Sequence, residues 1–165
     1  AHRNRYDSVL ALDDGGFKRN KKIAEMLKLP VSFIIKERDA RTREISLNGS
    51  KIVGDVSGQR VASFDDMLQG GGTLETGALI ARRHGARQVS FFVVHNDFTP
   101  KTFGRINPLL KDGTINKIYT VGTLPPRDRE KWHENFVVLS PAKMLADVIA
   151  RIHTEGHMRE LFLDL

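Results

Sequence analysis

Short apolar segments rich in β-branched residues recur along the chain and alternate with segments of helical periodicity. Each apolar segment is bounded by Gly, Pro, Asp or Asn, which favours buried strands over 8–12, 31–35, 60–64, 89–95, 117–121 and 136–139. Apolar residues three or four positions apart predict helices over 17–27, 73–84 and 141–153. This alternation predicts an α/β fold, in which helices flank a mostly parallel sheet.

The interval 37–59 breaks the alternation because it is charged and punctuated by glycine. Asn48-Gly49 is a strong signal for a tight turn and predicts a hairpin between 44–47 and 51–54. We therefore expect a flexible hairpin flap over 37–59, outside the core. Ligands of parallel sheets bind at the carboxyl ends of the strands, so the residues that follow each strand are the first candidates for a site.

Composition limits the possible functions. The 165 residues, 40% of them hydrophobic, fit one domain over 1–165, and the absence of cysteine excludes disulfides and thiolate zinc sites. No apolar run approaches the roughly 20 residues that cross a bilayer, so we expect a soluble, cytoplasmic protein without a membrane partner. The net charge of +6 favours anionic ligands. No basic stripe interleaved with aromatic residues is evident, so we expect no nucleic-acid partner.

The most informative motif, over 61–74, joins a strand, two acids, a run of three glycines and a helix. The two acids are suited to accept hydrogen bonds from adjacent sugar hydroxyls. The glycines allow backbone N–H groups to converge on an anion, and the helix N-terminus adds further amides and its dipole. A phosphate cradle beside a hydroxyl site predicts a pentose 5-phosphate as ligand. The residues of this predicted site are Asp65, Asp66, Gln69, Gly70, Gly71, Gly72 and Thr73.

Other interpretations of the motif are weaker. It is not a Walker loop, because no lysine follows the glycines, and the G-x-G-x-x-G spacing of dinucleotide sites is absent. The remaining alternative is a flexible turn beside solvated or helix-capping acids.

The motif resembles the phosphoribosyl-pyrophosphate binding loop of the type I phosphoribosyltransferase fold, and most closely that of ribose-phosphate pyrophosphokinases. Further matching segments follow in the same order: Leu12-Asp13-Asp14-Gly15-Gly16-Phe17-Lys18-Arg19, Ile35-Lys36-Glu37-Arg38, His95-Asn96-Asp97-Phe98 and Arg105-Ile106-Asn107. Most of the family has an acid followed by threonine where this chain has Gln69 and Gly70. That departure looks like the class II, plant-type branch.

The resemblance implies transfer of diphosphate from ATP to ribose 5-phosphate, giving phosphoribosyl pyrophosphate and AMP, with Mg²⁺, in a homo-oligomer. Family members have an N-terminal half of similar fold that supplies much of the nucleotide site. Position 1 is Ala and no such half precedes it in this sequence. We therefore expect residues 1–165 to be a C-terminal half that is inactive alone.

The resemblance also implies individual roles. Lys36 and Arg38 correspond to the two catalytic cations, and Asp13 to an aspartate that helps to hold magnesium. The nucleotide-phosphate residues would be Gly15, Gly16 and Arg19. The residues alone leave open that Asp13 or Asp14 caps the following helix and that Lys36 and Arg38 belong to a solvated hairpin.

Two other functions stay open. A nucleobase phosphoribosyltransferase would use the same loop, but no segment is identified as the hood that contacts the base. A non-catalytic regulatory subunit would bind the phosphates without transferring them, although the presence of Lys36, Arg38, Asp65 and Asp66 argues against it. We expect His95 to have a packing role, because no carboxylate partner can be assigned to it.

Overall fold

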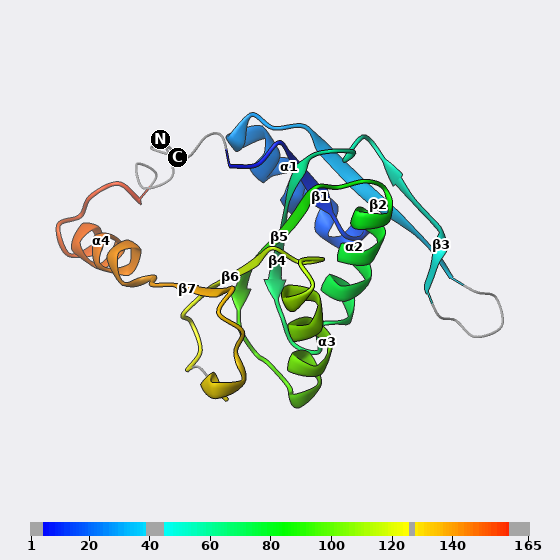
Figure 1. Ribbon diagram of the computed structural model, residues 1–165. Coiled ribbons are helices and arrows are strands. Elements are labelled where there is room, and N and C mark those ends of the chain that lie inside the picture. The colour runs from blue at the N-terminus through cyan, green and yellow to red at the C-terminus, as the bar shows by residue number, and fades with distance from the viewer. Residues whose placement is uncertain (1–4, 39–44, 126–127, 159–165) are drawn as a thin grey trace.

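The structure, a computed structural model, describes residues 5–38, 45–125 and 128–158, which form a seven-stranded sheet and its covering helices (Figure 1). The strands are β1 (Ser8–Ala11), β2 (Val31–Arg38), β3 (Ile45–Val53), β4 (Arg60–Met67), β5 (Gln88–His95), β6 (Lys117–Val121) and β7 (Phe136–Leu139). The helices are α1 (Asp14–Leu27), α2 (Gly72–Arg83), α3 (Pro100–Lys111) and α4 (Ala142–His153), with a short 3-10 helix η1 (Arg129–Lys131).

The strand order β3-β2-β1-β4-β5-β6-β7 changes direction at β1. All neighbouring strands are parallel except β2 and β3, which are antiparallel. α1 packs against β1, β2 and β4 on one face, and α2 and α3 lie side by side on the other (Figure 1). Right-handed crossovers produce this division of helices between the faces. The carboxyl ends of β1 and β4 therefore border the crevice in which such sheets bind ligands.

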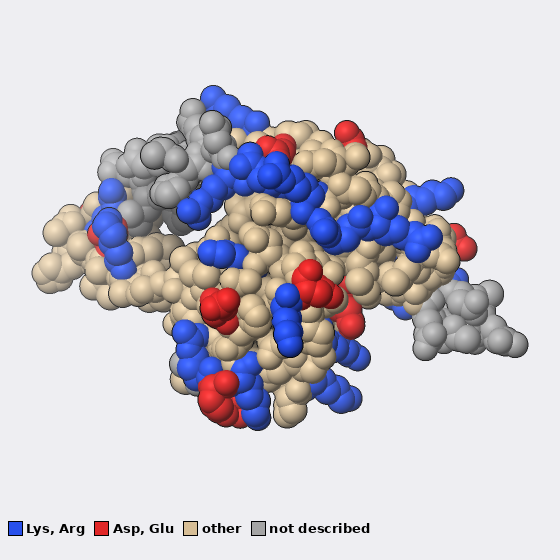
Figure 2. Space-filling model, viewed as in Figure 1, with Lys and Arg blue, Asp and Glu red and all other residues tan. Residues whose placement is uncertain are grey.

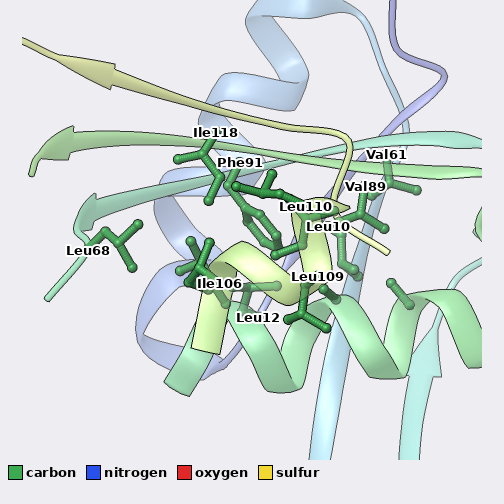
Figure 3. Packing of buried hydrophobic residues seen from close by; sticks show 14 of the residues in the cluster. Leu10, Leu12, Val61, Leu68, Val89, Phe91, Ile106, Leu109, Leu110 and Ile118 are labelled. Atoms are coloured by element: carbon green, nitrogen blue, oxygen red, sulfur yellow. The ribbon is translucent and has the colours of Figure 1, made fainter. Parts of the chain in front are cut away.

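The main core lies between the sheet and the helices α2 and α3. Leu10 of β1, Phe91 of β5 and Ile118 of β6 are at most 1% exposed and belong to one cluster with Ile106 of α3 (Figure 3). All four residues of β1 are buried, which explains why it has no polar alternation. Each such side chain contributes roughly 1.5–3 kcal/mol when fully buried. The strand ends thus project from a rigid base.

The predicted strands and helices are confirmed, with shifted boundaries. β2 continues to Arg38 and β4 to Met67, so the charged residues after the predicted strands lie within the strands themselves. The sequence pattern did not predict α3, because Gly104 and Pro108 interrupt its apolar periodicity. The start of α3 carries recognisable signals, namely Pro100 in the first turn and a capping box between Thr99 and Thr102.

The predicted hairpin turn at Asn48-Gly49 is wrong. Both residues lie within β3, and the register between β2 and β3 shifts beside them. The local turn signal produces a bulge, in which the Ser46 hydroxyl accepts a hydrogen bond from the Gly49 N–H at 3.0 Å. A Cβ atom at Gly49 would lie 2.5 Å from the Glu37 carboxyl group, so glycine makes room for that side chain. The true connection between β2 and β3, 39–44, lies outside the described residues.

Part of the interval 37–59 belongs to the core, contrary to the expectation that it lies outside. Val56 is 2% exposed, and Leu47 and Ile52 pack against the same cluster. Burial of these side chains joins the antiparallel pair β2–β3 to the domain. The far ends of β2 and β3 extend beyond the helices (Figure 1).

α4 stands apart from the rest of the domain (Figure 1). Its apolar side chains Met144, Leu145, Ile149 and Ile152 are 48–67% exposed. None of the helices within the described ranges has the length and apolar character that a membrane crossing requires. The residues predicted to form the site all precede β5, so α4 contributes none of them.

Candidate functional site

The predicted site residues converge at the carboxyl ends of β1, β2 and β4. Lys36 Nζ lies 3.8 Å from Asp13 Oδ2, a contact that joins the end of β2 to the segment between β1 and α1. Arg19 of α1 lies 3.3 Å from Asp65 and 3.5 Å from Asp66, which end β4. Parallel strands bring residues that are far apart in sequence to one edge in this way. In the resulting cluster, each cation lies beside one or two carboxylates.

Residues 68–71, between β4 and α2, form the glycine loop. This loop borders a cavity of about 370 Å³ that is lined by residues 65–74. Within the described part of the chain, no acceptor takes the backbone N–H groups of residues 69–73. Five donors therefore remain available, and those at the start of α2 also carry the positive end of the helix dipole. This arrangement is suited to bind an oxyanion.

Gly71 is the residue whose conformation the loop requires. It precedes α2 with φ +81°, a left-handed conformation that disfavours a Cβ atom. A Cβ atom there would also lie 3.0 Å from Cγ1 of Ile106. Because Ile106 is fully buried, it has little freedom to move. Close packing on α3 and the backbone conformation thus both select glycine.

The two acids at the end of β4 differ in their environments. Burial raises the pKa of Asp65, against the backbone hydrogen bond from Asp66 and the charge of Arg19. Burial also raises the pKa of Asp66, but the charge of Arg19 and the hydrogen bond with Asp65 outweigh it and lower the pKa overall. The Asp66 side chain is 71% exposed and that of Asp65 is 25% exposed. Asp66 is therefore the more accessible acceptor for a hydroxyl group.

Lys36 and Arg38 lie in the final residues of β2, whereas the sequence predicted that they follow the strand. The Lys36 side chain is only 14% exposed. Burial lowers the pKa of Lys36, and the charge of Asp13 opposes this effect. Arg38 is exposed, close to the described end of β2. Lys36 is thus held beside Asp13, at the same edge of the sheet as the acids of β4.

Asp13 has the capping role that the sequence left open. Its Oδ1 accepts the N–H of Gly16 at 2.9 Å and caps α1, so this amide is already engaged. Its Oδ2 faces Lys36. No group of three His, Asp or Glu residues that could hold a metal ion occurs within the described ranges. Magnesium needs only one or two carboxylates when phosphate oxygens and water complete its shell, so Oδ2 of Asp13 fits such a role.

Arg19 contacts the two acids of β4, whereas the resemblance implied a role at nucleotide phosphates. Its position depends on Asn20, which sequence reasoning missed. Asn20 is 1% exposed, and its carboxamide exchanges two 2.9 Å hydrogen bonds with the backbone of Phe64 in β4. This contact fastens α1 to β4 one residue before Asp65. The available signal was a single asparagine on the buried side of a predicted helix.

The side chain of His95, for which a hydrogen-bonded packing role was expected, is exposed and forms a hydrogen bond at the end of β5. Its Nδ1 lies 2.9 Å from the Thr123 hydroxyl, which in turn donates to the Val94 carbonyl at 3.2 Å. These contacts link the end of β5 to the segment after β6. His95 thereby stabilises the edge of the sheet that bears the site.

On the face shown in Figure 2, most of the positive charge lies away from this site. Figure 2 shows Lys and Arg side chains in a band across the upper part of the molecule, toward the C-terminal end of α2. Arg82 and Arg83 lie in that last turn, where they complement the helix dipole. The glycine loop lies at the opposite end of α2. Individual positions, and not the net charge, identify the site.

Comparison with known proteins identifies the family and the fold. Residues 2–109 match the model of the phosphoribosyl transferase domain. The chain belongs to this family. Its α/β sheet, with the glycine loop between β4 and α2, is the type I phosphoribosyltransferase fold predicted from the sequence motifs.

Within the phosphoribosyl transferase family, the chain is similar to ribose-phosphate pyrophosphokinases, as the motifs predicted. It is 33% identical over 155 residues to the protein of that name from Nostoc sp., covering 93% of this chain and 44% of the relative. It is 35% identical over 156 residues to ribose-phosphate pyrophosphokinase 1 of Lactococcus lactis subsp. lactis, covering 93% and 45%.

A crystal structure of phosphoribosylpyrophosphate synthetase from Mycobacterium smegmatis has the same fold, with a TM-score of 0.76 and 27% identity. The alignment covers 94% of this chain and 48% of that one. The chain thus spans a little under half the length of these relatives. The roles of the individual site residues stay predictions, and the activity of the whole protein is a matter for proposal.

Proposed function

We propose that this chain forms the ribose 5-phosphate half of a ribose-phosphate diphosphokinase, which transfers diphosphate from ATP to ribose 5-phosphate. The observation that carries the proposal is the set of five available N–H groups beside Asp65 and Asp66. A phosphate group occupies the amides, and two adjacent ribose hydroxyls donate to the carboxylates. The similarity to ribose-phosphate pyrophosphokinases supports this choice of substrate.

The chemistry follows from the charges around the loop. The anomeric hydroxyl of ribose attacks the β-phosphorus of ATP, its proton is released, and AMP departs. Lys36 and Arg38 offset the negative charge that builds up on the transferring oxygens. Bound Mg²⁺ would be held in part by Oδ2 of Asp13 and would neutralise charge on the triphosphate. Arg19 keeps Asp65 and Asp66 oriented until the ribose hydroxyls arrive.

The proposal gives different tasks to the amides and to the cations, and this difference can be tested. Lys36→Ala in the native protein should lower turnover, measured as AMP formation from ATP and ribose 5-phosphate, by about 100-fold or more. Affinity for ribose 5-phosphate should change little, because Lys36 does not line the loop cavity. Lys111→Ala, an exposed lysine at the far end of α3, serves as the control. Unchanged turnover in Lys36→Ala would contradict the assignment.

A nucleobase phosphoribosyltransferase is the second candidate, because one further cavity lies near the ends of β5 and β6. It measures about 400 Å³ and is lined by Asn96, Leu124, Trp132 and four other residues. A planar base would stack on the apolar wall of this cavity. Formation of a nucleoside monophosphate from phosphoribosyl pyrophosphate and a base would favour this candidate over the diphosphokinase.

A regulatory subunit would give a third result. Such a protein would bind ribose 5-phosphate through the loop but would produce no AMP in the native assembly. Turnover that Lys36→Ala abolishes would exclude this possibility. The homo-oligomer, Mg²⁺ dependence and ATP specificity are part of the same proposal, and the native protein is the form in which to measure them.

A further inference from the structure

The first turns of α3 lie directly behind the glycine loop and bind its carbonyl groups. The Thr102 hydroxyl donates a hydrogen bond to the carbonyl of Gln69, and the Thr99 N–H donates to the same oxygen at 3.3 Å. Arg105 Nη1 donates to the carbonyl of Gly70 at 3.1 Å. Two consecutive carbonyls of the loop are therefore directed toward α3.

The direction of these carbonyls sets the direction of the amides. Every peptide bond in the described chain is trans, so the C=O of one residue and the N–H of the next point to opposite sides. Binding of the Gln69 and Gly70 carbonyls to α3 turns the N–H groups of Gly70 and Gly71 away from α3. The loop cavity is lined by residues 65–74 and by no residue of α3. These two amides therefore face the cavity side of the loop.

The Thr102 hydroxyl has one fixed orientation. It accepts the backbone N–H of Thr99 at 3.0 Å as part of the capping box. A hydroxyl carries a single proton, and that proton is then directed to the Gln69 carbonyl. Thr102 is fully buried, so water does not compete for either bond. The cap of α3 and the orientation of the loop thus depend on the same hydroxyl group.

Arg105 is held behind the loop by a second contact. Its Nε lies 3.6 Å from Oε2 of Glu75, in the first turn of α2. A Cβ atom at Gly72 would lie 3.3 Å from Nη1 of Arg105, so the guanidinium packs against the loop backbone. The carboxylate of Glu75 keeps this cation outside the cavity. Arg105 therefore contacts the loop backbone and is not among the residues that line the cavity.

We propose that Thr102 and Arg105 are positioning residues, which orient the peptide planes of the loop before the oxyanion arrives. This inference rests on the proposed function of the loop as the phosphate site. Amides that are already aligned need no reorganisation on binding, so less of the binding free energy is lost. Removal of the Arg105 side chain leaves the Gly70 carbonyl unpaired, and removal of the Thr102 hydroxyl leaves the Gln69 carbonyl with only the 3.3 Å bond from the Thr99 N–H, so each peptide plane is freer to rotate.

The test compares matched pairs of variants in the native protein, with ribose 5-phosphate and inorganic phosphate as probes. Arg105→Met keeps the aliphatic bulk but no donor, and Arg105→Lys keeps a cationic donor. Thr102→Val and Thr102→Ser form the corresponding pair for the buried hydroxyl. Arg105 is 46% exposed, so its replacement leaves the fold intact. The Tm of each variant shows whether Thr102→Val remains folded.

We expect Arg105→Met and Thr102→Val to weaken binding of both probes by about tenfold. KM for ribose 5-phosphate should rise with little change in kcat, and the two conservative variants should recover most of the affinity. We also expect phosphate to shift the amide NMR resonances of Gly70 and Gly71 in the native protein, and to shift them less in the two defective variants. A merely structural role would lower the Tm without this loss of affinity.

The two levels of the argument fail in distinguishable ways. If phosphate and ribose 5-phosphate shift the Gly70 and Gly71 amides of the native protein, but Arg105→Met and Thr102→Val bind them equally well, the positioning role is refuted and the phosphate site stands. If the native protein itself shows no shift of these amides with either probe, the proposed function fails as well.

Discussion

Replacement of Gly71 by alanine tests whether the loop conformation itself makes the anion site. The substitution adds one methyl group at a residue with φ +81°, 3.0 Å from Cγ1 and 3.3 Å from Cδ1 of Ile106. Gly113 offers a matched control, because its φ is +78° but nothing lies within 4 Å of a Cβ atom there. Both substitutions cause the same backbone strain. Only the first disturbs the contact between the loop and α3.

The expected magnitudes follow from these two contributions. A left-handed conformation costs a residue with a Cβ atom about 1–2 kcal/mol, which is the expected loss of unfolding free energy for Gly113→Ala. Insertion of a methyl group against a packed core side chain costs typically a further 1–3 kcal/mol. Gly71→Ala should therefore lower the free energy of unfolding by roughly 2–5 kcal/mol.

Urea unfolding gives the two stability changes, and calorimetric titration with inorganic phosphate gives the change in affinity. Gly71→Ala should weaken phosphate binding by about tenfold or more, because the amides at the start of α2 move with the loop. Gly113→Ala should bind phosphate as the native protein does. Equal destabilisation of the two variants, together with unchanged phosphate binding by Gly71→Ala, would refute the reasoning.

Two further variants test the surrounding structure. Asn20→Ala leaves the partly buried N–H and C=O of Phe64 without the Asn20 partner, so it should lower the free energy of unfolding by about 3 kcal/mol, measured by urea denaturation. Asn48 is exposed, so Asn48→Ala serves as the control and should change the free energy of unfolding little. Hydrogen bonds from Arg60 lower the pKa of Asp7 from 3.8 to about 2, so this pair stabilises the fold above pH 3.8 and loses its effect as the pH falls toward about 2. Asp7→Asn should therefore be less stable than the native protein at neutral pH, and the difference should shrink over that interval in denaturation curves recorded at each pH. A constant difference would contradict the ion-pair account.

The sequence was sufficient for most of the sheet because its central strands are buried on both faces. β1, for example, consists of residues that are all shielded from solvent, and such strands read as continuous apolar runs. α3 was not predicted because Gly104 and Pro108 are poor helix formers. In the folded chain, packing of α3 on the core outweighs this low helix propensity. The turn predicted at Asn48-Gly49 failed for a related reason. Pairing of β3 with β2 absorbed a local turn signal as a bulge.

The site could be predicted as a set of residues but not as a set of contacts. Parallel strands necessarily bring Asp13, Lys36 and Asp65 to one edge, so their proximity follows from the order of the elements. The pairing of Arg19 with the two acids depends on the tilt of α1, which Asn20 fixes through a contact between residues 44 positions apart. Likewise, the support of the loop by α3 required knowledge of a helix that the sequence pattern did not show.

Calorimetric titration of the native protein with ribose 5-phosphate tests the phosphate and sugar site most directly. The account predicts one binding event per chain, weakened about tenfold or more when Asp65 and Asp66 are both replaced by asparagine, because the carboxylates accept the ribose hydroxyls. Inorganic phosphate should compete with the sugar for the loop amides and should bind the double variant as it binds the native protein. Absence of any binding of ribose 5-phosphate or phosphoribosyl pyrophosphate to the native protein would contradict the account.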